Sequence, residues 1–230
     1  MTIRAFIFDI DGTLVDSNEA HVEAWHAAFG AHGHDVPRER IRVEIGKGGD
    51  KLVPSIIGEA AEARDGESLR ERHSEEFLAI AGRRRLRAFP RAREIFDTLR
   101  QRGVRTALAT SSSREHLDAL GRSAGLRLSS LGEVLVNADD IEETKPAPDL
   151  VEAAVRKLGL EPEECVMIGD TPYDAEAACR AGVACIGVTS GGNEAEVLRE
   201  AGASPVWRDI AEIEAHLDEV LENASAEKKT

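Results

Sequence analysis

The sequence has few cysteines and no long hydrophobic run. Its 230 residues include 3 cysteines without a CxxC pair, so we interpret Cys165, Cys179 and Cys185 as small buried apolar residues rather than as disulfides or metal ligands. Its apolar runs, such as residues 183–188, are far shorter than the roughly 18 residues of a membrane-spanning helix. The first residues also do not show the basic region followed by an apolar stretch that is typical of a signal peptide. We therefore expect a cytoplasmic protein without a membrane partner.

Basic residues are in the minority. The chain has 29 Lys and Arg against 43 Asp and Glu, a formal net charge of -14, which repels the phosphates of nucleic acid and argues against such a partner. We interpret the one basic cluster as a solvated helix face; it contains Arg83, Arg84, Arg85 and Arg87. With 42% hydrophobic and 31% charged residues, the composition is that of a globular protein.

Short apolar runs alternate with helical patterns along most of the chain. The runs are residues 3–8, 104–109, 133–137, 165–168 and 184–188. Nearly continuous apolar runs that alternate with helices are typical of a parallel sheet covered by helices on both faces. The sequence therefore predicts an α/β fold with a doubly wound, Rossmann-like parallel sheet.

An insertion interrupts this alternation after the first run. About 95 residues separate the first two runs, where a crossover needs only about a dozen. They contain no convincing strand and four helical stretches, near 19–31, 37–46, 49–57 and 67–87. We therefore expect an all-helical cap domain at 17–88, inserted into a catalytic core of residues 1–16 and 89–230. The polar residues 224–230 are expected to form a frayed tail.

The first predicted strand ends in two acids. Asp9-Ile10-Asp11-Gly12-Thr13 follows the first apolar run, and the alternation of an extended chain points Asp9 and Asp11 the same way. Two carboxylates this close repel each other unless a divalent cation or a shared proton relieves the repulsion. The alternative is that both acids cap a turn before a helix.

Three further strand ends also carry polar groups. They are Thr110 to Ser113, Lys145 with Pro146, and Gly169 to Asp174. Each segment alone could be a helix cap or a surface lysine. Because a doubly wound sheet has its site at the carboxyl ends of its strands, we expect the segments to meet. Three carboxylates, a hydroxyl beside backbone N–H groups and a lysine suit metal-assisted phosphoryl transfer.

Together these residues resemble the four ordered motifs of the haloacid dehalogenase superfamily of phosphatases and phosphomutases, in the branch with a helical cap after the first strand. The matching residues are Asp9 with Asp11, then Thr110, then Lys145, then Asp170 with Asp174. The resemblance covers nearly the whole chain, cap included. Asp11 argues against the dehalogenase branch itself, which lacks the second aspartate of the pair.

The resemblance implies a magnesium-dependent reaction. Asp9 would be the nucleophile that forms an aspartyl phosphate, which divides one difficult displacement into two easier ones. Mg²⁺ would be held by the Asp9 carboxylate, the Asp11 backbone carbonyl and the Asp170 carboxylate, with Asp174 orienting these ligands from outside.

The resemblance also assigns roles around the phosphoryl group. Asp11 would protonate the leaving alkoxide and then take a proton from the attacking water, a role that needs a pKa raised toward neutrality. Thr110, the Ser111 backbone N–H and Lys145 would bind the phosphoryl oxygens.

Two cap positions remain open alternatives. His21 resembles a histidine that assists acid–base chemistry in sugar-phosphate mutases of this branch, although a helix histidine is more often structural. Residues 46–51 resemble the substrate-specificity loop of the branch, in which Lys47 would reach the substrate, but a Gly- and Lys-rich loop is also an ordinary connection. Gly191 and Gly192 are interpreted as a plain turn.

We therefore expect a Mg²⁺-dependent phosphatase acting on a small phosphorylated metabolite, of the phosphoglycolate-phosphatase-like kind. A sugar phosphomutase is the alternative that shares every core residue. A phosphoacceptor switch without turnover is disfavoured, because such modules need about half this length and lack an acid–base group like Asp11. The intact set of acids argues against a catalytically silent binding protein.

Overall fold

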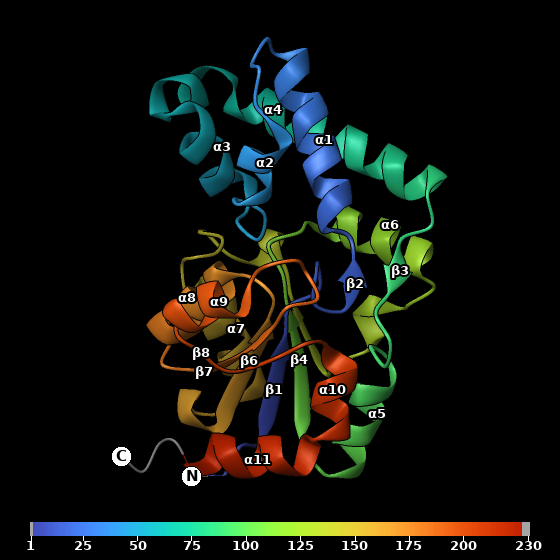
Figure 1. The fold of residues 1–230 in the computed structure, drawn as a ribbon, viewed down its shortest axis with the longest axis vertical. Coiled ribbons are helices and arrows are strands. Elements are labelled where there is room, and N and C mark those ends of the chain that lie inside the picture. Colours follow the sequence, from blue (N-terminus) through green and yellow to red (C-terminus); the bar gives the residue numbers. More distant parts are fainter. Residues whose placement is uncertain (1, 227–230) are drawn as a thin grey trace.

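The computed structural model describes residues 2–226 and contains a central sheet of six parallel strands. The spatial order is β5-β4-β1-β6-β7-β8 (Figure 1). The strands are β1 (Ala5–Phe8), β4 (Arg105–Ala109), β5 (Val134–Val136), β6 (Cys165–Gly169), β7 (Ala184–Val188) and β8 (Ala203–Trp207). The chain builds outward from β1 in one direction and from β6 in the other, so the predicted doubly wound α/β sheet is confirmed.

All five apolar runs form strands of the central sheet, and the sequence pattern missed only the sixth strand of this sheet, β8. This strand is polar at Ser204 and contains Pro205, which has no N–H to donate to a neighbour. It is tolerated because β8 lies at the edge of the sheet, where it pairs with β7 alone.

Helices cover both faces of the sheet. Alternate β1 side chains point to opposite faces, so Phe6 and Phe8 pack in one hydrophobic layer and Ile7 in the other. The first layer is closed by α5 (Glu94–Gln101), α6 (Arg114–Ala124), α10 (Ile210–Ala215) and α11 (Leu217–Ala226). The second is closed by α7 (Asp149–Leu158), α8 (Pro172–Arg180) and α9 (Ala195–Glu200).

The helical cap stands over the carboxyl ends of the strands (Figure 1). Its helices are α1 (Asn18–Ala31), α2 (Arg38–Arg42), α3 (Gly49–Ile57) and α4 (Glu59–Arg83). They enclose a separate hydrophobic cluster that includes Trp25, Phe29, Leu52 and Leu69. α4 begins earlier than predicted. Its first residues are charged, Ala or Gly, without a large apolar side chain, so they carry no apolar periodicity that could reveal the helix.

Two short strands join the cap to the core. β2 (Val15–Asp16) pairs antiparallel with β3 (Arg87–Ala88), although the range 17–88 was expected to hold no strand. Two residues are too few for a periodic pattern, so only the tertiary pairing identifies them.

Three smaller expectations are wrong in part. The basic cluster does not share a helix face, because α4 ends at Arg83 and Arg87 lies in β3. Cys165 and Cys185 are buried as expected, but Cys179 is exposed. Of the expected tail, residues 224–226 belong to α11, and residues 227–230 lie outside the described part of the chain.

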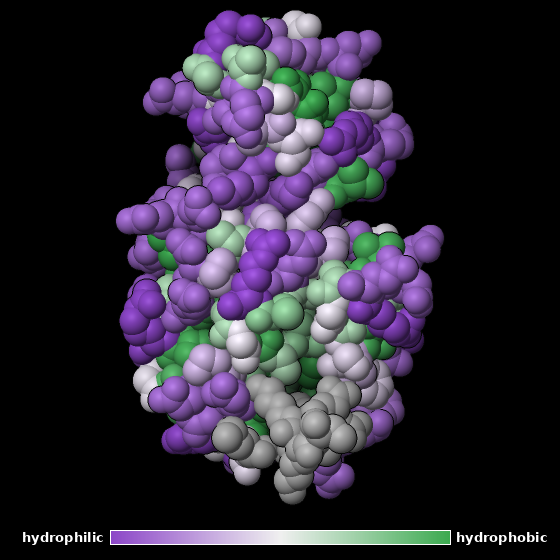
Figure 2. All heavy atoms as spheres, turned by 90° about the vertical axis from the view of Figure 1, so that its left-hand side faces the viewer, coloured by the Kyte–Doolittle hydropathy of each residue, from purple (hydrophilic) through white to green (hydrophobic). Residues whose placement is uncertain are grey.

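The surface offers little apolar area. Figure 2 shows one face on which hydrophobic residues form only small, separate groups among hydrophilic ones. Among residues 2–226, the exposed large hydrophobic side chains are Val43 and Val197. None of the described helices combines the length and the apolar character needed to cross a bilayer.

Candidate active site

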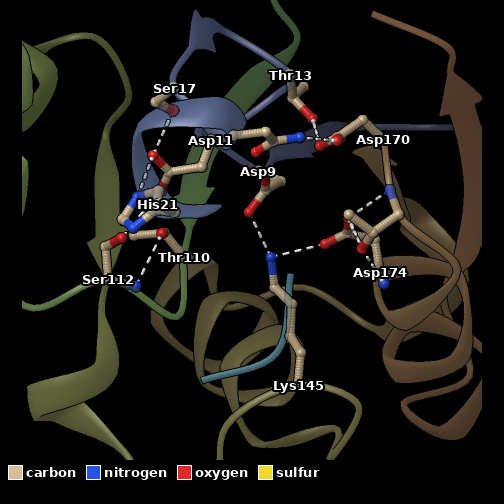
Figure 3. A network of polar contacts seen from close by, with 12 residues as sticks. Asp9, Asp11, Thr13, Ser17, His21, Thr110, Ser112, Lys145, Asp170 and Asp174 are labelled. Atoms are coloured by element: carbon tan, nitrogen blue, oxygen red, sulfur yellow. Dashed lines mark hydrogen bonds and ion pairs between the residues drawn. The ribbon is translucent and has the colours of Figure 1, made fainter. Parts of the chain in front are cut away.

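The turn after β1 brings Asp9 against a buried lysine. The Asp9 backbone N–H donates to Ile168 O at 2.9 Å, which fixes the residue beside β6. The Lys145 side chain is only 1% exposed, and its Nζ contacts Asp9 Oδ1 and lies 2.6 Å from Asp174 Oδ1 (Figure 3). Burial disfavours the charged form of Lys145, but Asp174 and Asp9 outweigh it and raise the pKa of this lysine. The ammonium is therefore held charged between two carboxylates.

Asp170, directly after β6, accepts hydrogen bonds on both carboxylate oxygens. Thr13 Oγ1 donates to Oδ1 at 2.9 Å, and Asn18 Nδ2 donates to Oδ2 at 3.0 Å and to Gly191 O at 3.1 Å. A Cβ at Gly12 or Gly191 would overlap the Asp170 carboxylate. Gly191 and Gly192 do lie in a turn, closed by a hydrogen bond from the Gly192 N–H to Thr189 O at 3.0 Å. The expectation missed that this turn packs over an active-site acid.

Three buried carboxylates, those of Asp9, Asp170 and Asp174, converge at this end of the sheet. Each offers one oxygen within 4.8 Å of the others, and Lys145 supplies only one compensating charge. Burial and the charge of Asp174 raise the pKa of Asp170 to about 7. An oxygen-only donor set with surplus negative charge fits a hard divalent cation such as Mg²⁺. Asp174, expected to act from outside, lies as close as the other two acids.

The Asp11 carboxylate is turned away from that cluster. Ser17 Oγ donates to Oδ1 at 2.6 Å, His21 Nε2 lies 3.2 Å from the same oxygen, and Ser112 Oγ donates to Oδ2 at 2.9 Å (Figure 3). Burial tends to raise the pKa of Asp11, but His21 and the two hydroxyls outweigh it and hold this pKa well below its usual value. The expected raised pKa is therefore wrong for this state, because the partners stabilise the ionised form.

A cluster of histidines continues from Asp11 into the cap. His21 Nδ1 lies 3.2 Å from His73 Nε2, and the His73 ring stacks on Trp25 with centroids 4.0 Å apart. His116 of the core reaches Ser74 of α4, Nε2 to Oγ 2.9 Å. Burial lowers the pKa of His73 well below its usual value and that of His116 to about 4, so both rings are neutral near pH 7. Sequence reasoning found His21 but missed these two, which lie on distant segments.

The hydroxyl-rich turn after β4 offers groups for a phosphate. Thr110 is buried, and its Oγ1 accepts a hydrogen bond from the Ser112 N–H at 3.1 Å. The Ser111 Oγ is buried and has no hydrogen-bond partner among the described residues. Ser113 then caps α6 by accepting from the His116 N–H. The free Ser111 hydroxyl is therefore available to a ligand, although only its backbone N–H was expected to serve.

These groups face a cavity of about 510 Å³ between core and cap. Asp9, Asp11, Thr110 and Ser111 are part of its lining. Lys47 lines the cap side, as expected for a specificity loop, but its Nζ contacts Glu44, lies 3.0 Å from Ser55 Oγ and sits 4.7 Å above the Tyr173 ring. Its ammonium group is therefore already engaged within the cap and with α8.

Known proteins resemble the chain over most of its length. The family model for haloacid dehalogenase-like hydrolases matches residues 3–182. The chain is 31% identical over 208 residues to a phosphoglycolate phosphatase of Nitrosospira multiformis, covering 87% of this chain and 89% of that protein. A crystal structure of a hydrolase from Pseudomonas syringae matches with a TM-score of 0.87 and 33% identity, covering 94% of this chain and 98% of that one.

One plant relative is much longer. The chain is 32% identical over 213 residues to Protein SUPPRESSOR OF QUENCHING 1, chloroplastic, of Arabidopsis thaliana; this covers 92% of the chain but only 20% of the plant protein.

The family-model match and the two full-length likenesses agree with the sheet, the inserted helices and the four motifs at the strand ends. The chain belongs to the haloacid dehalogenase-like hydrolase family, in the branch with a helical cap.

Proposed function

We propose that the protein hydrolyses the phosphomonoester of a small metabolite in a Mg²⁺-dependent reaction through a phosphorylated Asp9. The observation that carries this proposal is the convergence of Asp9, Asp170 and Asp174 around Lys145, with Asp9 in the lining of the cavity. Nucleophile, cation ligands and a fixed positive charge are the parts that phosphoryl transfer requires.

In the first step, Asp9 attacks phosphorus and the substrate alkoxide leaves. Lys145, Thr110 and Ser111 bind the phosphoryl oxygens, where charge must be held during transfer. Mg²⁺, held by Asp9 and Asp170 with Asp174 beside them, would neutralise charge on the phosphoryl group. Asp11 is positioned by Ser17, Ser112 and His21 to manage the proton of the leaving group, and then that of the hydrolytic water.

The Asp11 geometry reconciles its role with its lowered pKa. In this state the carboxylate is ionised, so Asp11 must first take up a proton, through His21 or from solvent, before it can protonate the leaving alkoxide. His21 is therefore proposed as the partner of Asp11 in acid–base chemistry, in line with its placement on the wall of the cavity.

Phosphate release separates the proposal from its alternatives. Purified protein should release inorganic phosphate from a panel of phosphomonoesters with Mg²⁺ and lose turnover in EDTA. A sugar phosphomutase would instead convert its own substrate into an isomer with little free phosphate, and a phosphoacceptor switch would hold phosphate on Asp9 for hours. No release from any panel member would overturn the proposed function.

A further inference from the structure

The cap side of the cavity contains two basic side chains, and both are already neutralised. Arg70 Nη1 lies 2.6 Å from Glu62 Oε1, and Lys47 Nζ contacts Glu44. Releasing Lys47 would also break its bond to Ser55 and its contact with the Tyr173 ring. A substrate group that needs a cation on this side would have to displace an existing partner first.

Three acidic side chains of the cavity lining are compensated less than these cations. Asp50 and Glu71 line the cavity from the cap, and Glu142 lines it from the core. Among residues 2–226, no basic side chain forms an ion pair with Glu71 or Glu142. The nearest cation to Asp50 is Lys51, whose Nζ lies 3.9 Å from Asp50 and 3.3 Å from Glu143, so it is shared between two acids.

The histidines of the cavity do not reverse this balance. His73 and His116 are buried and neutral near pH 7, and His21 is engaged by Asp11 and His73. The region that receives the leaving group therefore carries net negative charge and has no free cation among the residues that the structure describes.

Resting on the proposed function, we propose that the substrate carries no negatively charged group besides the phosphoryl group. Its leaving group is either a neutral alcohol with further hydroxyl groups or an alcohol that carries an amine. A carboxylate or a second phosphate on the leaving group would face three acids without a free cation, which disfavours binding. Hydroxyl and ammonium groups can donate hydrogen bonds to these acids. The proposed reaction is unchanged by this inference, but phosphoglycolate itself is a poor substrate for this chain.

Three esters of two-carbon alcohols test the inference at nearly constant size: phosphoglycolate, 2-hydroxyethyl phosphate and phosphoethanolamine. Each gives the free alcohol and inorganic phosphate on hydrolysis. The expected kcat/KM for the hydroxyl and amine esters exceeds that for phosphoglycolate by at least about tenfold at low ionic strength. Equal or higher kcat/KM for phosphoglycolate overturns the inference and leaves the proposed function intact, whereas absence of release from every ester overturns the proposed function.

Charge-removing variants show whether the wall is the cause. Glu71→Gln and Glu142→Gln together should raise kcat/KM for phosphoglycolate relative to 2-hydroxyethyl phosphate by at least about threefold. The matched control is Glu67→Gln, an exposed residue one turn away on α4 that does not line the cavity. An unchanged ratio in the double variant, or an equal change in the control, rules out these acids as the source of the preference.

Discussion

The core part and the cap part of the site hold their polar side chains in different ways. On the core side, Asp9, Lys145 and Asp170 are almost fully buried, and each is fixed by residues far away in sequence. On the cap side, Lys47 and Arg70 are only partly buried and pair with acids within eight positions along the chain.

This contrast separates chemistry from substrate choice. Burying a charged side chain costs free energy unless other segments supply ion-pair and hydrogen-bond partners. Changing one charged residue of the core site therefore disturbs the whole site. Pairs at the partly exposed cap wall contribute little each, and changing one shifts mainly which leaving group is accepted. Variants on the two sides should therefore differ in both size and kind of effect.

The largest effect is expected for Asp9→Asn, which removes the proposed nucleophile while keeping its size. Phosphate release should fall by at least about a thousandfold, measured at saturating substrate and Mg²⁺. Asp16→Asn, an exposed acid in β2, is the control and should keep its rate. Near-normal rates in Asp9→Asn would show that another residue attacks phosphorus.

A smaller loss is expected for Gly191→Ala, on the core side but outside the family motifs. The added methyl would overlap the Asp170 carboxylate and turn it from its position. Mg²⁺ affinity, measured by calorimetry on the whole protein, should fall about tenfold to a hundredfold.

Gly192→Ala is the control in the same loop. Gly192 has a φ of 99°, so alanine strains the backbone there, but no neighbouring atom lies within 4 Å of the added Cβ. If both variants lower Mg²⁺ affinity equally, general disturbance of the loop explains the loss and the contact with Asp170 does not.

His21→Phe tests the contact that crosses from cap to core. Phenylalanine can keep the stacking on Phe77, where the ring centroids are 4.0 Å apart, but loses both nitrogen contacts. We expect kcat to fall about tenfold with little change in KM, because Asp11 loses its imidazole partner. His32→Gln, near the end of the same helix, should change neither. A rise in KM alone would indicate that His21 binds substrate instead.

The smallest effect is expected for Lys47→Ala on the cap side. Because the ammonium is engaged by Glu44 and Ser55, kcat/KM for 2-hydroxyethyl phosphate should change by less than about threefold. Glu44 keeps Arg40 as a partner at 2.6 Å, so the fold should tolerate the change. A tenfold rise in KM would instead mean that Lys47 leaves its partners and reaches the substrate.

Local patterns determined much of the fold and the motif residues of the site. Continuous apolar runs and helical spacing predicted the sheet and the inserted helices, since burial on two faces demands such runs. Asp9, Thr110, Lys145 and Asp170 were identified because each follows a predicted strand, and a doubly wound sheet gathers those ends.

Only the tertiary structure decided which other side chains complete the site. Asn18, Gly191 and His73 lie in segments with no motif of their own. Asn18 contacts Asp170 and His73 contacts His21, in both cases across more than 50 positions, and Gly191 lies against Asp170 from a different loop. The same holds for charge: the sequence contains Lys47 and Glu71, but only packing decides that one is neutralised and the other faces the cavity. Sequence patterns record the periodicity of each element, whereas contacts and charge compensation depend on how distant elements meet.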